Sequence, residues 1–230
     1  MKAARVLAWS LAAIIVLAGA LQLWYLGHVL WWKHQPPRQT AFMERRLDEL
    51  REKNLQAELR YRWVDYQAIS PQLKRAVIAA EDMKFVDHEG FDWDGIQRAL
   101  EKNQQRGKAV AGGSTISQQL AKNLFLSGER SYWRKGQEAI ITLMLEAVLD
   151  KRRILELYLN VAEWGEGVFG CEAAARHYFN VPAAKLSAEQ SARLAAMLPR
   201  PRYYDRNRGS AYLARYADRI AGRMGAAQVP

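Results

Sequence analysis

Two adjacent acids, Glu81 and Asp82, are the residues of this chain best suited to acid–base chemistry. They follow the apolar run 76–80. Burying such a run and ending it in carboxylates costs free energy unless the acids are paired, solvated in a cleft or used in a reaction. On this stretch alone, a general base at Glu81 and an ordinary helix that ends in solvated acids explain the pattern equally well.

Helix polarity favours the catalytic interpretation. Ser70 followed by Pro71 is typical of a helix start, so the helix should end near Glu81. The helix dipole disfavours a carboxylate at that end, and burial against apolar neighbours acts in the same direction. Both effects raise the pKa of Glu81, and a glutamate with a pKa closer to neutrality can accept a proton from a hydroxyl group.

The stretch 112–123 is a second candidate site. Its two glycines allow a tight turn, and Ser114 can cap a helix whose free amides would attract an anion. At 3.6 residues per turn, Ser114, Gln118 and Lys122 share one face of that helix. A stripe of hydroxyl, amide and ammonium groups would then face away from the core. The alternative is a capped amphipathic surface helix, and the stretch lacks the Gly-Lys-Ser/Thr of a Walker loop.

A third stretch contains Arg134, Lys135 and Glu138 at the start of a strongly apolar segment. Arg134 and Glu138 are four residues apart, which is typical of an ion pair along a helix. Because an apolar segment follows, Glu138 is expected to be partly buried and to face a cleft. Lys135 would then add to a cationic site for phosphate.

Metal and nucleic-acid sites find little support in the sequence. His88-Glu89 lacks the second histidine of the zinc-protease pattern, and the nearby acids do not have calcium-loop spacing. No cofactor is required by the sequence, although a divalent cation, Mg²⁺ or Mn²⁺, near Glu81 and Asp82 stays an open alternative. We find no nucleic-acid-binding motif.

The elements that position these residues begin with an apolar N-terminal segment. Residues 6–32 contain no Asp, Glu, Lys or Arg, and about 20 such residues are enough to span a bilayer as a helix. Aromatic residues at its end suit the membrane interface. A cleaved signal peptide is the alternative, because residues 18–20 resemble a cleavage site, but the apolar run continues beyond them. The basic residues 1–5 should stay in the cytoplasm, which places the rest of the chain outside it.

We therefore divide the chain into a cytoplasmic N-terminus (1–5), a transmembrane anchor (6–32), a linker or neck (33–62) and one domain (63–230). Helical periodicity predicts helices over about residues 70–82, 92–105, 114–126, 131–149, 151–162, 171–179, 187–198 and 211–222. The segment 131–149 is almost entirely apolar from residue 139 onward, so it should form the buried centre. Residues 106–113 and 165–170 read as loops. Apart from a short extended piece at 63–66 we find no convincing strand, and the domain should be mainly α.

Composition is consistent with a basic domain at a membrane. The 230 residues include 34 Lys and Arg against 24 Asp and Glu, a formal charge of +10. Such a surface attracts phosphates, whether in nucleic acid, anionic headgroups or a diphosphate substrate. Cys171 is the only cysteine, so no intrachain disulfide can form.

Taken together, four stretches resemble the successive motifs of the peptidoglycan glycosyltransferase family, in that family's order and spacing, over about residues 63–204. They are Glu81-Asp82-x-x-Phe85-x-x-His88-x-Gly90, Gly113-Ser114-Thr115-Ile116-Ser117-Gln118-Gln119-x-x-Lys122-Asn123, Arg134-Lys135-x-x-Glu138 and Ile154-Leu155-Glu156-x-Tyr158-Leu159-Asn160. The resemblance implies a mainly α, lysozyme-like glycosyltransferase domain with a membrane-apposed lobe. The family also includes the glycosyltransferase domain of bifunctional penicillin-binding proteins. This chain lacks their Ser-x-x-Lys and Lys-Thr-Gly motifs and ends at Pro230, so we expect no transpeptidase activity.

The resemblance also implies a reaction. Glu81 would deprotonate the 4-hydroxyl of the acceptor GlcNAc, whose oxygen attacks C1 of the donor MurNAc with inversion and expels undecaprenyl diphosphate. Glu138 would be the second catalytic glutamate, which orients the cationic cluster or assists the acceptor. The implied substrate-binding residues are Ser114, Gln118, Lys122, Asn123, Arg134, Lys135 and Phe85; Lys122, Arg134 and Lys135 would bind the diphosphate.

The implied substrates are lipid II and the growing glycan linked to undecaprenyl diphosphate, polymerised at the outer face of the cytoplasmic (inner) membrane by a single-pass protein. Proteins of cell-wall synthesis or division are further expected partners, and nucleic acid is not. Two other functions remain open on sequence grounds. One is a lysozyme-like enzyme that cleaves the wall, since a single Glu in a helical domain also suits that chemistry. The other is a non-enzymatic, membrane-anchored scaffold that binds the wall.

Overall fold

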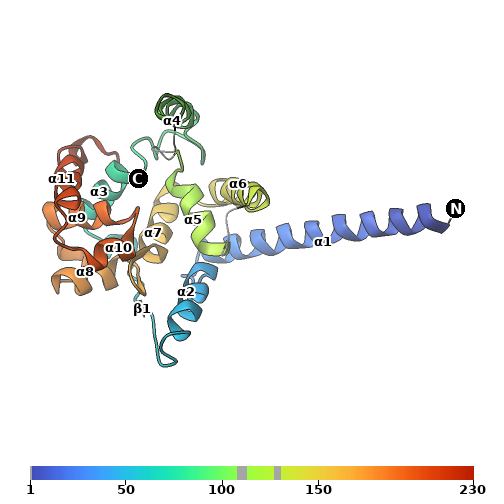
Figure 1. The fold of residues 1–230 in the computed structure, drawn as a ribbon, viewed down its shortest axis with the longest axis horizontal. Coiled ribbons are helices and arrows are strands. Elements are labelled where there is room, and N and C mark those ends of the chain that lie inside the picture. The colour runs from blue at the N-terminus through green and yellow to red at the C-terminus, as the bar shows by residue number, and fades with distance from the viewer. Residues whose placement is uncertain (1, 108–112, 127–130) are drawn as a thin grey trace.

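The computed structural model describes residues 2–107, 113–126 and 131–230 (Figure 1). The helices are α1 (Lys2–Trp32), α2 (Ala41–Arg51), α3 (Pro71–Glu81), α4 (Trp93–Arg106), α5 (Ile116–Phe125), α6 (Tyr132–Val148), α7 (Lys151–Val161), α8 (Cys171–Phe179), α9 (Ala188–Met197), α10 (Pro201–Arg206) and α11 (Ala211–Ala221). Short 3₁₀ turns lie at Tyr66–Ala68, Ala183–Lys185 and Met224–Ala226. The mainly α class is confirmed. Most of the loop predicted over 106–113 lies outside the described residues.

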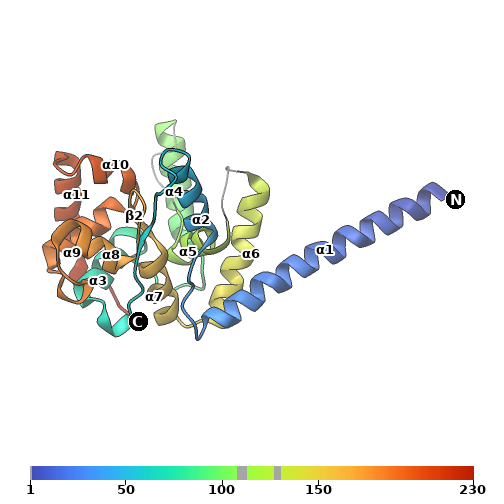
Figure 2. The same ribbon diagram turned by 90° about the horizontal axis from the view of Figure 1, so that it is seen from below.

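Helix α7 forms the buried centre of the domain. All its residues from Ile154 to Val161 are buried, and it packs against α5, α6 and α8. Helices α3, α9 and α11 pack together on one side of it, whereas α5 and α6 lie on the other, toward α1 (Figure 2). A helix that is enclosed on all sides in this way stabilises the fold by burying apolar area around its whole circumference.

The predicted helix ends agree closely with the structure where a capping residue marks them. The Ser70 hydroxyl accepts a hydrogen bond from the Gln72 amide at 3.2 Å and begins α3, which ends at Glu81 as predicted. Ser187 and Gln190 form the expected capping box of α9. Caps are local features, because they satisfy amides that the first helical turn leaves unpaired.

The expectation of no strand outside residues 63–66 was wrong. A small sheet of order β1-β3-β2 contains β1 (Arg60–Tyr61), β2 (Glu163–Gly165) and β3 (Val168–Phe169). The predicted glycine loop is thus an antiparallel hairpin, and β1 joins it in parallel with Arg60 opposite Val168. Strands of two or three residues are too short to show an alternating pattern, and β1 pairs with residues far away in sequence.

The segment 33–62, expected to be a linker or neck, contributes to the folded domain. Besides β1 it contains α2, which packs against α5. The guanidinium of Arg46 on α2 is buried and donates two hydrogen bonds to Glu163, at 2.7 and 3.1 Å. Because both partners are withdrawn from water, this pair holds α2 in a fixed place beside β2.

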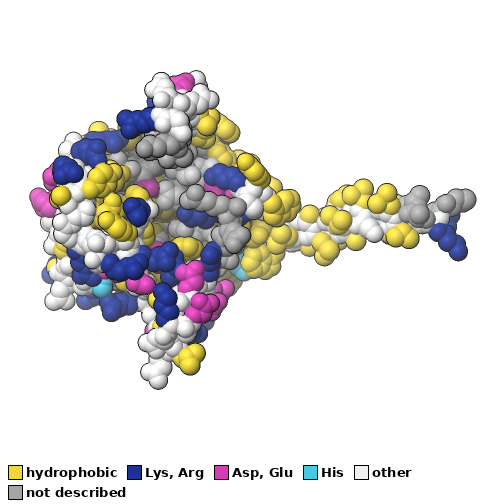
Figure 3. All heavy atoms as spheres, viewed as in Figure 1, with side chains coloured by type: hydrophobic (Ala, Val, Ile, Leu, Met, Phe, Trp, Pro, Cys, Tyr) yellow, Lys and Arg dark blue, Asp and Glu magenta, His cyan; other side chains and the backbone are white. Residues whose placement is uncertain are grey.

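The prediction that 131–149 forms the buried centre was also wrong. One face of α6 packs against α5 and α1, but Trp133 is 71% and Leu143 is 55% exposed. Apolar residues around a whole helix indicate burial in protein or in lipid, and hydropathy alone does not distinguish the two. Figure 3 shows hydrophobic side chains over α6 and the adjoining part of α1.

Helix α1 extends away from the domain and is long and apolar enough to cross a membrane over Arg5–Trp32 (Figure 1). Its last turns dock on the domain. The Tyr25 and Trp32 rings each lie 5.0 Å from the ring of Phe125 on α5, centre to centre. The Gln22 amide donates a 2.9 Å hydrogen bond to Gln137 on α6.

Candidate functional site

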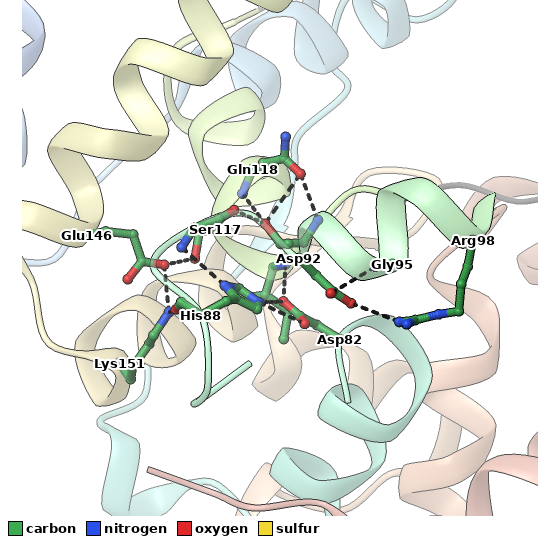
Figure 4. Close-up of polar contacts among 12 residues, drawn as sticks. Asp82, His88, Asp92, Gly95, Arg98, Ser117, Gln118, Glu146 and Lys151 are labelled. Carbon is green, nitrogen blue, oxygen red and sulfur yellow. Dashed lines mark hydrogen bonds and ion pairs between the residues drawn. The ribbon is translucent and has the colours of Figure 1, made fainter. Parts of the chain in front are cut away.

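The two acids at the end of α3 have different environments, and Asp82 connects the first motif to α5. Its carboxylate accepts the backbone amide of Ile116 at 3.0 Å and contacts His88 Nε2 at 3.0 Å (Figure 4). The Gly90 amide donates to His88 Nδ1 at 3.1 Å, which fits a histidine with its proton on Nε2. Asp82 is therefore held in a structural network.

The same network continues toward α6 and α7. Lys151 donates to Glu146 at 2.8 Å and to the carbonyl of His88 at 2.5 Å, and the Ser117 hydroxyl reaches the same Glu146 oxygen at 2.5 Å. Gly90 has φ +91° and a Cβ there would lie 2.8 Å from Thr142. The loop of the first motif therefore approaches α6 so closely at position 90 that only glycine fits there.

Helix α5 begins one residue later than predicted. Thr115, not Ser114, is the N-cap, and its hydroxyl accepts the Gln118 amide at 3.2 Å while the Gln118 side chain accepts the Thr115 amide at 3.0 Å. Gln118 is consequently buried and does not join Ser114 and Lys122 on an open face. The expected stripe was wrong at this position because the side chain completes a capping box.

Glu81 faces Gln119, the neighbour of the predicted Gln118. The Gln119 amide donates to Glu81 Oε2 at 2.7 Å, and its oxygen accepts the hydroxyl of Tyr158 at 2.9 Å. Burial raises the pKa of Tyr158 well above its usual value, so the phenol keeps its proton and donates it to this bond. The chain from Tyr158 through Gln119 thus fixes the orientation of the Glu81 carboxylate and leaves its other oxygen for a further partner.

The pKa of Glu81 is raised, as expected from the sequence. Desolvation by burial is the main cause, and the charge of Asp82 acts in the same direction. The hydrogen bond from Gln119 and the charge of Lys122 oppose it. A carboxylate in this environment is a stronger proton acceptor than an exposed one, yet it still has a cation nearby to stabilise its charged form.

A cationic cluster lies beside Glu81. Lys122 on α5 is largely desolvated, and this lowers the pKa of its ammonium group. Glu138 and Glu81 raise that pKa, whereas Arg134 and Lys135 lower it, so all four lie within electrostatic reach of Lys122. Buried Glu138 pairs with Lys135 and, at 3.7 Å, with Arg134. The third motif thereby presents its two cations from the start of α6, as its sequence spacing suggested.

Glu81 and Gln119, which are joined by a hydrogen bond, line two different hollows. A pocket of about 250 Å³ is lined by Glu81, Ser114 and residues of α4. A larger cleft of about 670 Å³ is lined by Gln119, Lys122, Asn123 and residues of α2 and α10. Because Gln119 bonds to Glu81, the acid lies between the hollows, where a group bound in one could approach a group bound in the other.

Phe85 lines neither hollow, and its predicted role in substrate binding stays a prediction. Its ring is fully buried, and the Lys151 ammonium lies over it at 4.8 Å from the ring centre. The side chain shapes the loop that follows Glu81. Apolar residues in a catalytic motif are often there for packing, and their sequence gives no sign of which role applies.

The described residues offer no cluster of typical metal ligands. In the part of the chain that the structure describes, no three His, Cys, Asp or Glu side chains gather into a group that could hold an ion. Glu81 and Asp82 are adjacent in sequence but face Gln119 and Ile116 respectively. A divalent cation near these two acids stays a prediction.

Gln119 and Tyr158 belong to the site but are not among the residues that the sequence predicted for it. Gln119 was in the second motif, but Gln118 was chosen because it shares a face with Ser114 and Lys122. Gln118 instead completes the capping box at Thr115, and Gln119 is the side chain that faces Glu81. Tyr158 was in the fourth motif, and the only signal was a polar hydroxyl on a helix otherwise buried in the core.

Comparison with known proteins agrees with these motifs. A family model described as Transglycosylase matches residues 48–225. Three of the similar proteins, all with the name Biosynthetic peptidoglycan transglycosylase, illustrate the match. The one from Laribacter hongkongensis is 61% identical over 96% of this chain and 97% of its own length. The one from Aromatoleum aromaticum is 62% identical over 96% and 95%. The one from Dechloromonas aromatica is 64% identical over 91% and 90%. The chain therefore belongs to the transglycosylase family.

Proposed function

We propose that Glu81 is the general base of this protein, which is a peptidoglycan glycosyltransferase of cell-wall synthesis. Its substrates are lipid II as acceptor and the glycan linked to undecaprenyl diphosphate as donor. The observation that carries the proposal is the Glu81 carboxylate between two hollows, with a raised pKa and within reach of the Lys122 charge.

The reaction needs one proton acceptor and one anion site. Glu81 removes the proton from the 4-hydroxyl of the acceptor sugar as that oxygen bonds to C1 of the donor. The bond from C1 to the diphosphate oxygen breaks, with inversion at C1, and the diphosphate leaves with the bonding electrons. Lys122, Arg134 and Lys135 stabilise the charge that develops on the leaving group, and a desolvated cation is effective there because little water screens it.

Glu138 has a positioning role in this proposal. It is buried and paired with Arg134 and Lys135, so its charge holds both cations at the start of α6. Ser114 and Asn123 line the hollows on either side of Glu81 and contribute hydrogen bonds to the sugars. Gln118 supports the site indirectly by capping α5.

We further propose that α1 is a single-pass anchor in the cytoplasmic membrane and that the domain lies on its outer side. Its length and hydropathy, the basic residues before it and the exposed apolar face of α6 support this. An outer, membrane-apposed domain would meet a substrate whose prenyl tail lies in lipid and whose sugars lie outside it. Partners among cell-wall synthesis or division proteins belong to the same proposal.

Polymerisation of labelled lipid II by the purified full-length protein tests the function directly. We expect long glycan strands, and parallel reactions with and without a chelator test whether a divalent cation is required. Release of soluble fragments from isolated peptidoglycan, with no product from lipid II, would instead support the wall-cleaving alternative. Neither product would support the scaffold.

The pH dependence of polymerisation provides a further prediction. Glu81 must be deprotonated to act as a base, so the rate should rise with pH through the raised pKa of that group, above the usual value of 4.5. Lys122 must stay protonated, so the rate should fall at alkaline pH through a pKa below the usual 10.5. A bell-shaped profile of kcat/KM is expected. A rate that stays flat down to pH 4.5 would contradict the assignment of the base.

A further inference from the structure

The larger cleft carries more positive charge than the leaving diphosphate requires. Among the described residues that line it, six are cationic and two are acidic, an excess of four positive charges. The cations are Arg45, Arg46, Lys122, Arg200, Arg202 and Arg206, and the acids are Glu49 and Glu163. Five of the six cations come from α2 and from the segment that leads into and forms α10. These elements lie apart from α6, where Arg134 and Lys135 are found.

The acids near these arginines do not neutralise them, although Arg206 also lies 4.0 Å from Glu166, which is outside the cleft lining. Glu163 is taken up by the buried Arg46, through bonds of 2.7 and 3.1 Å. Glu49 is shared, because it lies 3.1 Å from Arg45 and 3.8 Å from Arg202 and also contacts Arg46. One carboxylate among three guanidinium groups leaves most of their hydrogen-bonding capacity open.

The backbone at α10 holds its arginines at the rim of the cleft. Pro201 occupies the first position of α10, so Arg200 is the N-cap residue of that helix. Its guanidinium lies 4.3 Å from the centre of the Tyr203 ring. Arg202 and Arg206 are one turn apart and their side chains are 45% and 66% exposed. Figure 3 shows Lys and Arg side chains gathered across this face, over α10 and toward α2.

We infer that Arg45, Arg202 and Arg206 form a second anion site in the cleft. This site binds the carboxylates of the peptide that lipid II carries on its disaccharide. This rests on the proposed function. The cleft has a volume of about 670 Å³ and continues from Gln119 to α2 and α10, which gives room for more than the reacting sugars. Guanidinium groups bind carboxylates through paired hydrogen bonds, so the site would select substrates with an acidic peptide.

The test crosses an enzyme change with a substrate change. The enzyme change is the triple variant Arg45→Gln, Arg202→Gln and Arg206→Gln, which removes three charges and keeps a shorter, polar side chain at each position. The substrate change converts the peptide carboxylates of lipid II to amides. Arg75→Gln, which removes one charge at an exposed arginine of α3 outside the cleft, is the control for charge loss away from the site, and thermal unfolding checks that every variant folds.

We expect the triple variant to raise the apparent KM for lipid II about tenfold, a change of about 1.4 kcal/mol, with kcat within about threefold of wild type. Amidation should raise the wild-type KM by a similar factor. The triple variant should treat both substrates alike, because each change removes the same interaction. Arg75→Gln should behave as wild type.

The inference would be overturned if the triple variant also raised the KM of the amidated substrate about tenfold above the wild-type value for that substrate, because the arginines would then serve the diphosphate or the fold. Unchanged kinetics in the triple variant would also overturn it, since the arginines would then be a solvated surface. Failure of the wild-type protein to polymerise either substrate would overturn the proposed function itself and this inference with it.

Discussion

Glu81→Gln should reduce the rate of glycan polymerisation by about 10²–10⁴-fold, the range typical of losing a general base. The substitution preserves the size of the side chain and an oxygen that can accept the Gln119 amide, which now lies at 2.7 Å. It removes only the ability to bind the acceptor's proton. The measurement is kcat on labelled lipid II at the pH optimum, and Gln119→Ala, which leaves the carboxylate in place, is the companion variant. A smaller loss of kcat in Gln119→Ala than in Glu81→Gln would show that Gln119 orients the carboxylate and that Glu81 transfers the proton.

The same variant should fold at least as stably as the wild type. Burial raises the pKa of Glu81 in the folded protein, so the folded state holds the proton more tightly than the unfolded state does. Stability is therefore lost as pH rises from the unfolded pKa through the folded pKa, and Gln escapes this loss. Thermal unfolding at neutral pH checks this. Wild-type-like polymerisation by a folded Glu81→Gln protein would remove Glu81 as the base.

Lys122→Ala should lower kcat/KM for lipid II by about 10²–10³-fold, a loss comparable to removing one donor from a preorganised anion site. Lys122 interacts electrostatically with both glutamates of the site, Glu81 and Glu138, and with Arg134 and Lys135. Its loss should therefore weaken both donor binding and departure of the diphosphate. Lys122→Arg keeps the charge and should lose less.

A second measurement separates this role from a structural one. The Lys122 charge lowers the pKa of Glu81, so removing it should move the acidic limb of the pH–rate profile to higher pH. A structural defect would lower the rate at every pH without moving that limb. Unchanged turnover together with an unchanged apparent affinity would rule out Lys122 as a diphosphate ligand.

Features that depend on neighbouring residues were predictable from the sequence. The caps at Ser70 and Ser187, the end of α3 at Glu81 and the ion pair of Glu138 with Arg134 all arise within one or two helical turns. The raised pKa of Glu81 belongs with them, because the helix end and the apolar residues around it lie in one short stretch.

Features that depend on distant segments were not predictable. The sheet joins Arg60 to Val168, and the exposed face of α6 is defined only by its packing against α5 and α1. At α5 the sequence did not show that Gln118 completes the cap, nor that Gln119, about 100° further around the helix, faces Glu81 on the distant α3. Function was easier to predict than these contacts. Four motifs in a fixed order are compatible with few functions, whereas the sequence of one helix is compatible with many ways of packing it.

The docking of α1 has a mechanical consequence. Phe125 ends the helix that carries Lys122, and the Tyr25 and Trp32 rings clasp it. These contacts join the last turns of α1 directly to the helix that carries Lys122. If α1 crosses the bilayer, the reacting sugars are held at a constant height above it, so each new lipid must arrive by sliding sideways and the finished strand must leave outward.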